Sequence, residues 1–300
     1  CPRRDRAMVP FRPMTEADVP GAVAAFDSGL LAMLARHGLP TTGSSIQDER
    51  RRIDRTRHFL GTDPDGSWVA EEDGAVIGMS QSFVREDYWM LSQLGTVPGR
   101  QGHGVGRQLL SLALSHGDPH SPGTIQCSRD PKAMALYTSF GFALHPVVAA
   151  WGVLRPGAVE RPSKVVRLEP DQVAERELDT VTGIDRKVRG SARPVDIVAM
   201  LTQVGTRLLL HDDQGYAVAA DDRVITLGAR NEESACLVLR AALAEVPMGE
   251  TVEVNWLTMA QQWAIRVVVQ AGIELQPYGP VMVRGMDGPP SPYIPSGGYG

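Results

Sequence analysis

The hexapeptide QGHGVG, residues 101–106, has the residue types and spacing of a glycine-rich loop that binds an anion. It lies between a run typical of a strand, residues 90–96, and a run typical of a helix, residues 107–115. Glycine lets a backbone approach an anion closely. A helix that begins here would direct unpaired N–H groups and the positive end of its dipole at that anion. The loop therefore predicts a pyrophosphate-binding site.

A second pattern, residues 130–142, predicts a short helix that carries Tyr137. Asp130 and the proline after it are typical of a helix start, apolar residues follow at i, i+3, i+4 and i+7, and Gly141 is typical of a helix end. A tyrosine on such a face is either a core residue with its hydroxyl at the edge or a proton donor. For an isolated tyrosine, the core interpretation is favoured.

Together the two patterns resemble the GCN5-related N-acetyltransferase (GNAT) superfamily. Its signature is Q/R-x-x-G-x-G/A, followed by N-x-x-A-x-x-L-Y-x-x-x-G-F. The first element is matched by Gln101, Gly104 and Gly106. The second is matched, with aspartate in place of asparagine, by Asp130, Ala133, Leu136, Tyr137, Gly141 and Phe142. The resemblance covers residues 10–153 well and residues 165–284 only as a degenerate relative.

The resemblance implies a fold, a cosubstrate and a reaction. The fold would be α+β (mixed α/β), with two tandem GNAT-like domains, each a mostly antiparallel, splayed central sheet flanked by helices. Acetyl-CoA would give its acetyl group to a primary amine by direct attack, with Tyr137 as the general acid for the departing thiolate. The coenzyme would be held by Leu94, Gly95, Thr96, Gln101, Gly102, His103, Gly104, Val105, Gly106, Arg107, Asp130, Ala133 and Tyr137.

The general base stays open. Many members of the superfamily carry a carboxylate on the fourth strand, where this chain has Ser92 and Gln93. A water chain or another group would then take the amine's proton. The candidates, none supported by spacing, are Glu86, Asp87, His120, His145 and a carboxylate at Gly300.

The pattern around Tyr137 recurs in the second half of the chain with the same internal spacing, so that Ala264 corresponds to Ala133. The same constant offset places Val268 where Tyr137 stands, and residues 232–237 where the glycine loop stands. That stretch begins with two glutamates and has no glycine, so charge and shape both argue against a pyrophosphate there. We expect a duplicated fold whose second copy has lost both functions. The alternative is a chance alignment of two common helix-strand patterns.

Turn and linker composition divides the chain into four parts. They are a catalytic domain at 10–154, a linker at 155–163, a degenerate GNAT-like domain at 164–286, and a Pro/Gly-rich tail at 287–300. The tail is expected to lack regular structure and to lie on the surface or in a cleft.

Within the first domain, a helix should begin at Thr15 and end near Leu34. After a loop over 38–45, an arginine-rich helix is expected over 46–60, and three strands, 67–70, 75–84 and 88–96, should form a meander. The arginines either face solvent or border a pocket for an acceptor that carries carboxylate or phosphate.

Composition narrows the class of protein. The net charge is -5 and 43% of the 300 residues are hydrophobic, which is ordinary for a soluble protein and makes nucleic acid an unlikely partner. Three widely spaced cysteines give neither a disulfide framework nor a metal site, and we expect no metal. The absence of an export signal or a membrane-length apolar stretch predicts a cytoplasmic protein that does not bind membranes.

Three functions are compatible with these patterns. The favoured one is an N-acetyltransferase whose acceptor is a small-molecule or peptide amine. The others are a non-catalytic acyl-CoA sensor and a structural scaffold. The acceptor and the oligomeric state cannot be predicted from the sequence.

Overall fold

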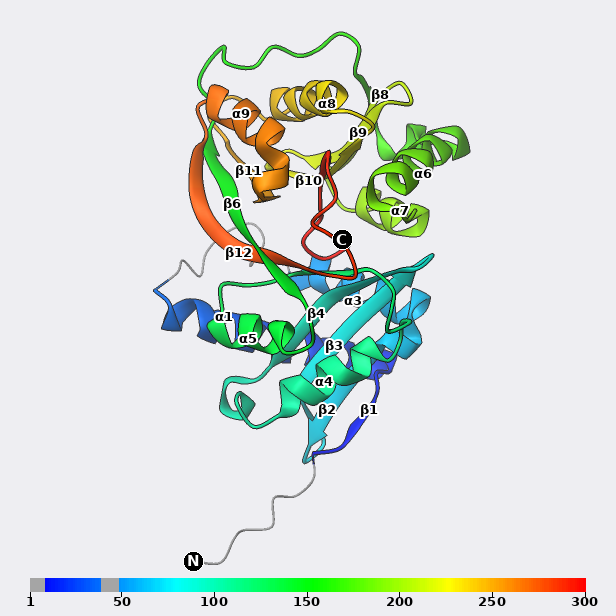
Figure 1. The fold of residues 1–300 in the computed structure, drawn as a ribbon, viewed down its shortest axis with the longest axis vertical. Coiled ribbons are helices and arrows are strands. Elements are labelled where there is room, and N and C mark those ends of the chain that lie inside the picture. Colours follow the sequence, from blue (N-terminus) through cyan, green and yellow to red (C-terminus); the bar gives the residue numbers. More distant parts are fainter. Residues whose placement is uncertain (1–8, 39–48) are drawn as a thin grey trace, which may run out of the picture. The chain divides into compact units, whose positions relative to one another are not determined.

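The computed structural model describes residues 9–38 and 49–300 (Figure 1). Most of the loop predicted over 38–45 and the first three residues of the helix predicted over 46–60 lie outside these ranges. So does Cys1.

The described residues run through the same series of elements twice. The first copy contains, besides short 3-10 turns, β1 (Phe11–Pro13), α1 (Val19–Arg36), α3 (Glu49–Thr62), β2 (Ser67–Glu72), β3 (Ala75–Arg85), β4 (Tyr88–Thr96), α4 (Val105–Leu114), β5 (Gly123–Gln126), α5 (Pro131–Thr138) and β6 (Ala143–Val153). The second contains β7 (Val166–Leu168), α6 (Glu175–Arg189), α7 (Pro194–Leu201), β8 (Arg207–His211), β9 (Gly215–Ala220), β10 (Arg223–Ala229), α8 (Glu232–Ala244), β11 (Thr251–Leu257), α9 (Gln262–Gln270) and β12 (Glu274–Arg284). A final strand, β13 (Tyr293–Ile294), follows.

The predicted offset, which relates Ala133 to Ala264, also maps β6 residue for residue onto β12. The duplicated, mixed α/β fold with antiparallel sheets is therefore confirmed. The residue boundaries of the four parts stay a prediction. Residues 143–153 form a single long strand.

The chain packs as two compact units. The first comprises the described residues up to 84 together with 91–119, and the second comprises 85–90 with 120–300. In the first unit, the Asp73-Gly74 turn joins β2 to β3. Both turn residues have positive φ, 51° and 78°, as a tight hairpin requires.

Helices cover both faces of the first unit's sheet, as alternation along a strand demands. On β2, Val69 packs with α1 and α3, whereas its neighbour Ala70 packs with α4. The start of α1 is fixed by Asp18. Its carboxylate accepts the backbone N–H of Thr15 at 2.8 Å and a guanidinium N–H of Arg12 at 2.7 Å.

Helix α1 and the 3-10 turn before it need one correction. The segment Glu16–Arg36 has the length and apolar composition of a membrane-crossing helix, which was not expected. Core helices of soluble proteins pass the same test. Here Val19 and Ala22 of α1 are fully buried against Val69. Within the first unit, the segment is a core helix.

In the second unit, the strand order is β5-β12-β6-β11-β10-β9-β8-β7. β6 therefore lies between β11 and β12, and β12 lies between β5 and β6, both antiparallel to their neighbours. The last strand of each copy is thus inserted beside strands of the other. β10 and β11, by contrast, are parallel, and their pairing covers only Arg223–Val224 with Glu253–Val254.

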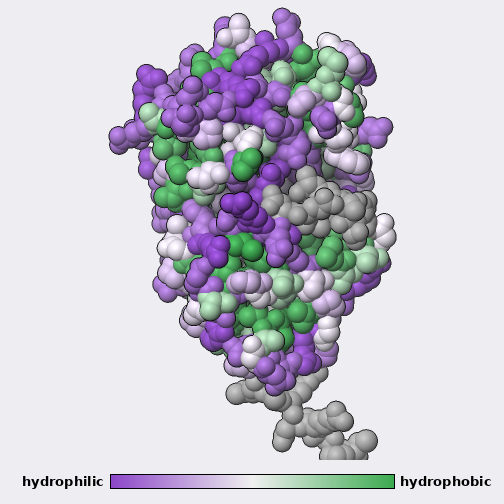
Figure 2. All heavy atoms as spheres, turned by 180° about the vertical axis from the view of Figure 1, so that it is seen from behind, coloured by the Kyte–Doolittle hydropathy of each residue, from purple (hydrophilic) through white to green (hydrophobic). Residues whose placement is uncertain are grey.

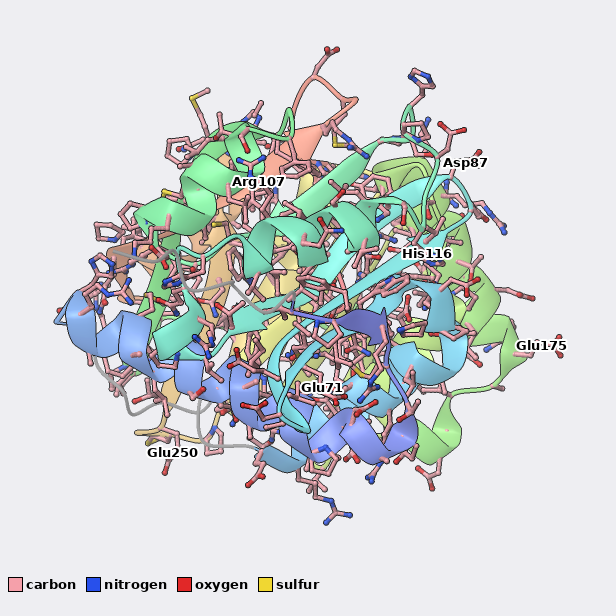
Figure 3. The ribbon with its side chains drawn as sticks, turned by 90° about the horizontal axis from the view of Figure 1, so that it is seen from below. Glu71, Asp87, Arg107, His116, Glu175 and Glu250 are labelled. Atoms are coloured by element: carbon pink, nitrogen blue, oxygen red, sulfur yellow. The ribbon has the colours of Figure 1, made fainter. Side chains whose placement is uncertain are left out.

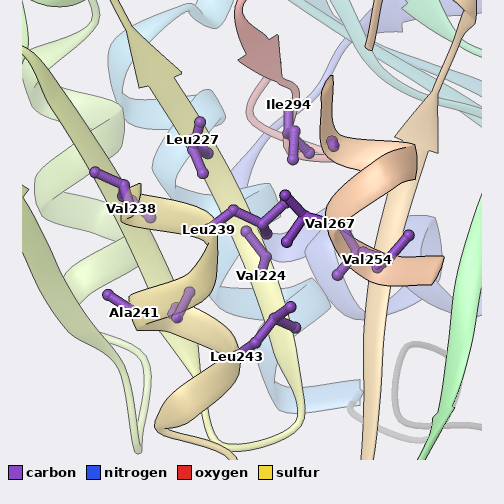
Figure 4. Close-up of a cluster of buried hydrophobic side chains, with 14 of the residues drawn as sticks. Val224, Leu227, Val238, Leu239, Ala241, Leu243, Val254, Val267 and Ile294 are labelled. Atoms are coloured by element: carbon purple, nitrogen blue, oxygen red, sulfur yellow. The ribbon is translucent and has the colours of Figure 1, made fainter. Parts of the chain in front are cut away.

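The core of the second unit lies between its sheet and helices α8 and α9 (Figure 4). Leu239 from α8 and Val267 from α9 meet Leu227 and Val254 from the strands. Ile294 from the tail belongs to the same cluster.

The outer surface seen in Figure 2 mixes hydrophilic and hydrophobic residues, as the composition leads one to expect.

The tail differs from its prediction. It contains β13, which pairs with β10, and residues 293–296 are buried. The expectation that prolines and glycines exclude regular structure was wrong, because a very short strand can form between the prolines.

Candidate functional site

The glycine loop of the first unit has the backbone that its sequence predicts. Gly102 and Gly104 adopt φ values of 79° and 91°, which a residue with a side chain rarely takes. A Cβ at either position would meet nothing within 4 Å. The loop therefore presents bare backbone toward open space, as a phosphate cradle requires.

Helix α4 begins directly after Gly104 and is firmly anchored. Val105 and Leu109 are buried against the sheet, and the Ser80 hydroxyl donates to the Leu109 carbonyl at 3.1 Å. The N–H groups of the first turn have no intrahelical partner by geometry, and they point out of the helix start. Arg107 lies on this turn with an exposed side chain (Figure 3).

Polar side chains fasten the start of the loop. Arg36 at the end of α1 donates to Gln101 Oε1 at 2.8 Å, and Gln101 Nε2 donates to the carbonyl of Thr96 at 3.5 Å. One ring nitrogen of His103 lies 3.0 Å from the Gln101 carbonyl. Gln101 thus ties the loop to both the end of β4 and α1. The role of Arg36 was missed because no spacing links it to the loop.

The end of β4 lies unusually close to α1. A Cβ on Gly95 would stand 2.9 Å from Cα of Phe26, and a Cβ on Gly29 would overlap the carbonyl oxygen of Thr96. Glycine at both positions therefore lets the helix backbone approach the strand. The first unit brings the predicted residues Leu94–Thr96 and Gln101–Arg107 into one continuous segment, β4-loop-α4.

The other predicted residues lie on the second unit, around α5. Asp130 caps the helix, since its carboxylate accepts the N–H of Lys132 at 2.9 Å. Ala133 and Tyr137 follow one turn apart on the same face. Within the described part of the chain, the Tyr137 hydroxyl makes no hydrogen bond, and the residue is only 6% exposed.

Burial raises the pKa of Tyr137 well above its usual value, and Cys127 and Asp130 nearby add to the shift. The phenol therefore stays protonated throughout the neutral range. Burial also raises the pKa of the Cys127 thiol to about 12, which makes that thiol a poor nucleophile. A proton donor, and no activated thiol, is available beside α5.

The second copy has a different surface at the matching helix start. Asn231 caps α8 by accepting the N–H of Ser234 at 2.8 Å, and Glu232 and Glu233 occupy the first turn. Val268 on α9 is fully buried where the first copy has Tyr137. An anion at this helix start would meet two carboxylates.

The structure does not single out a general base. The carboxylate of Glu86 accepts from Arg186 at 2.8 Å and from the backbone N–H of Ala192 at 3.2 Å. These bonds lower its pKa despite the opposing effect of partial burial, so it is a weak base. Gln93 is buried, and its amide donates to Gln81 at 3.1 Å.

The arginine-rich helix α3 is largely committed to ion pairs. Arg52 lies 2.7 Å from the Asp27 carboxylate and is 8% exposed, and Arg57 lies 2.6 Å from Glu16. Two of the arginines thus hold α3 to the segment around α1. Among the described residues, no group of three or more His, Cys, Asp or Glu side chains is placed to hold a metal ion.

Comparison with known proteins identifies the family of part of the chain. Residues 33–142 match the model of the acetyltransferase (GNAT) family. This part of the chain is similar to GNAT domains. A mycothiol acetyltransferase of Streptomyces avermitilis is 34% identical over 119 residues, which are 38% of this chain and 37% of that enzyme. The match thus spans little more than a third of the curated relative.

Solved structures extend the likeness in fold to the whole chain. A Pyrococcus horikoshii protein assigned as an acetyltransferase matches with a TM-score of 0.76 at 18% identity, covering 99% of both chains. A tandem GNAT protein from the clavulanic acid biosynthesis pathway matches with a TM-score of 0.54 at 16% identity, covering 92% of this chain and 98% of that one. The duplicated fold of this chain is therefore like that of a tandem GNAT protein.

Proposed function

We propose that this protein is an acetyl-CoA-dependent N-acetyltransferase whose first copy transfers the acetyl group to a primary amine. The observation that carries the proposal is the open loop of residues 101–106. Two left-handed glycines there leave room in front of helix α4. Such a helix start binds phosphate through backbone N–H groups and the helix dipole.

In this proposal, the residues found along β4-loop-α4 hold the coenzyme. Backbone N–H groups from Gly102 to Arg107 bind the pyrophosphate, and the edge of Leu94–Thr96 accepts the pantetheine arm as an added strand. The bonds of Gln101 to Thr96 and Arg36 keep the loop in place before the coenzyme binds. Asp130 and Ala133 would contact the coenzyme from α5, as the family motif implies.

Tyr137 acts as the general acid. The amine nitrogen attacks the thioester carbonyl, a C–N bond forms as the C–S bond breaks, and the sulfur takes the phenolic proton. The amine's own proton leaves to a base or water chain that we do not assign. A thiol has a pKa of about 8.5, below that of the buried phenol. Transfer of the proton to sulfur is therefore uphill, and the hydrogen bond from the phenol to the developing thiolate supplies part of the stabilisation. The phenol is protonated throughout the neutral range because its own pKa is raised, and the phenolate left after transfer regains a proton from solvent.

The acceptor is a primary amine of a small molecule or peptide. The curated relative named above is a mycothiol acetyltransferase, but the match spans only 37% of its length. We therefore do not extend its acceptor to this chain. A cytoplasmic location fits a reaction that consumes acetyl-CoA.

A panel of amines tests the proposal. Release of free thiol from acetyl-CoA is measured with antibiotics, polyamines, amino acids and peptides as acceptors. We expect at least one primary amine to give thiol release that depends on both substrates. Acetyl-CoA binding without turnover of any amine would support a non-catalytic acyl-CoA sensor. Failure to bind acetyl-CoA at all would leave only a scaffold.

Tyr137→Phe separates the enzyme from the sensor. We expect kcat to fall about 100-fold or more, because a general acid typically contributes that much, with the Kd for acetyl-CoA nearly unchanged. Tyr278→Phe is the matched control. Burial also raises the pKa of Tyr278, to about 12, but this tyrosine lies on β12 outside the motif. Equal rates for the parent and Tyr137→Phe would remove Tyr137 from the mechanism.

A further inference from the structure

The tail forms a strand on an edge of β10. Ile294 pairs with Leu227 and Tyr293 pairs with Gly228, in antiparallel register. The backbone N–H of Ala229 donates to the Pro292 carbonyl at 3.1 Å, so the pairing continues to the end of β10. The tail therefore satisfies backbone groups that would otherwise form an open edge.

This edge is the one that β11 leaves uncovered. β10 pairs with β9 along one side, whereas on the other side its parallel pairing with β11 covers only Arg223–Val224 with Glu253–Val254. β13 pairs with β10 just beyond that point, at Leu227 and Gly228. The tail thus fills the place where two parallel strands stop pairing.

In the proposed function, the pantetheine arm of the coenzyme pairs with the corresponding segment of β4 in the first copy. Leu94-Gly95 of β4 and Leu227-Gly228 of β10 are the same dipeptide in matching strands of the two copies. Each dipeptide lies near the end of its strand and is followed by the matching helix, α4 or α8. The tail therefore pairs with the second copy's counterpart of the Leu94–Thr96 edge.

Buried polar contacts hold the end of the tail in place. Arg193 is fully buried and donates to the carbonyl oxygens of Tyr299, at 2.9 Å, and of Gly300. The hydroxyl of Tyr293 donates to the Gly300 carbonyl at 2.7 Å, and the Thr226 hydroxyl donates to the Ile294 carbonyl at 2.9 Å. The tail is thus bound by the side chains of the second copy as a peptide ligand would be.

The shape of the tail supports a specific fit. Trp256, on the irregular end of β11, has a φ of 64°, a strained value for a bulky residue. A Cβ on Gly297 would stand 3.2 Å from its indole nitrogen. A Cβ on Gly300 would overlap the sulfur of Met90, so a side chain there would have to displace that methionine.

We propose that residues 290–300 are a built-in peptide ligand of the second copy, which takes the place of a coenzyme arm there. The analogy with a coenzyme arm rests on the proposed function, because that function assigns the matching edge of β4 to the coenzyme. The second copy has lost the phosphate loop, and the tail fills the strand edge that remains. The tail is a permanent occupant rather than a lid, so its removal opens a site for peptide and not for acetyl-CoA.

Complementation by a peptide tests this assignment. A chain ending at Met286 is titrated with a synthetic peptide of residues 287–300. We expect a lower thermal midpoint for the shortened chain, one-to-one binding of the peptide, and recovery of the midpoint. The control peptide carries Ile294→Asp and should neither bind to the shortened chain nor raise its thermal midpoint. The parent chain should bind neither peptide.

Three results would overturn the proposal. They are a shortened chain as stable as the parent, a folded shortened chain that does not bind the peptide, and a shortened chain that gains a second equivalent of acetyl-CoA. The last would make the tail a lid. Stability and peptide binding are measured without coenzyme, so this proposal can fail while the proposed acetyltransferase activity stands. Equally, the acetyltransferase activity can be absent while the peptide still binds.

A full-length variant covers the case in which the shortened chain does not fold. Ile294→Ala removes one tail side chain from the core cluster. We expect the amide of Ala229 to exchange with deuterium about tenfold faster or more, through local opening of the tail. The amide of Val218, in the middle of β9, should keep its parent rate. Asp287→Ala, at an exposed tail position, is the control and should change neither rate. An unchanged rate at Ala229 in Ile294→Ala would contradict the proposal.

Discussion

The two copies share their elements but differ in the connection before the matching helix. In the first copy, residues 97–104 join β4 to α4, whereas in the second only residues 230–231 join β10 to α8. The longer connection forms an open glycine loop. The shorter one ends in an asparagine cap followed by two glutamates. The same fold therefore forms with and without an open glycine loop, so the fold alone does not determine the site.

A second difference concerns the strand edges. In the second copy, the edge at Leu227 and Gly228 is covered by the tail. In our proposal the equivalent edge of the first copy is kept for acetyl-CoA. A copy that holds no coenzyme still has to satisfy the backbone groups along this edge, and a short peptide is sufficient for this.

Gly104→Val should give the largest effect. Valine cannot easily adopt a φ of 91°, so the loop must rearrange. We expect the Kd for acetyl-CoA, measured by calorimetry, to rise about 100-fold, which is about 2.7 kcal/mol. Gly249→Val is the matched control, because Gly249 in the second copy has a φ of 86° and equally open space. A similar loss in both variants would mean that backbone strain, and not the loop, is responsible.

Acid should weaken the Asp18 contacts of the 3-10 turn before α1 more than the counterpart contacts in the second copy. Arg12 holds the pKa of Asp18 well below its usual range, so this stabilisation is present above about pH 4, the unfolded pKa, and is lost as the pH falls below it. In the second copy, the neutral Gln172 caps the equivalent turn.

Asp18→Gln removes the titrating group. We expect it to cost about 1–2 kcal/mol at pH 7 and to flatten the fall in stability between pH 5 and pH 3. Urea unfolding across this range measures both effects. Parallel curves for the parent and Asp18→Gln would contradict the assignment.

The cap of α5 tests whether Asp130 has a structural role besides its motif position. Asp130→Ala should lower the free energy of unfolding by about 1 kcal/mol, because the N–H of Lys132 loses its acceptor. Asp130→Asn, the residue of the family signature, should cost less than about 0.5 kcal/mol. Asn231→Ala, which removes the cap of α8, should match the alanine variant. Equal stability of all the variants would show that neither cap contributes.

Neutralising the second copy should have the smallest effect. Replacing Glu232 and Glu233 by glutamine removes the repulsion but restores neither the glycine loop nor the open edge. We therefore expect acetyl-CoA binding to stay at one equivalent per chain. Binding of a second equivalent would mean that the charge of the two glutamates alone prevents acetyl-CoA from binding to the second copy.

Local sequence signals predicted the first copy's elements well. The strands that begin at Ser67, Ala75 and Tyr88, the helix start at Thr15 and the glycine loop each depend on a few neighbouring residues, and the structure has all of them. The repeated spacing around Ala133 and Ala264 also predicted the second copy's closing helix and strand.

Long-range features could not be predicted in this way. The insertion of β12 between β5 and β6 depends on pairings between segments far apart in the sequence, and no local pattern encodes a partner. The strand at Tyr293–Ile294 is surrounded by prolines and forms only because β10 offers an edge. The contact of Gly95 with Phe26 likewise arises from packing.

Calorimetric titration of the full chain with acetyl-CoA tests the central claim most directly. The account predicts one equivalent bound per chain in the parent and a large loss of affinity in Gly104→Val. No binding, two equivalents, or one equivalent that Gly104→Val leaves unchanged would contradict the claim that the first copy's glycine loop alone holds the coenzyme.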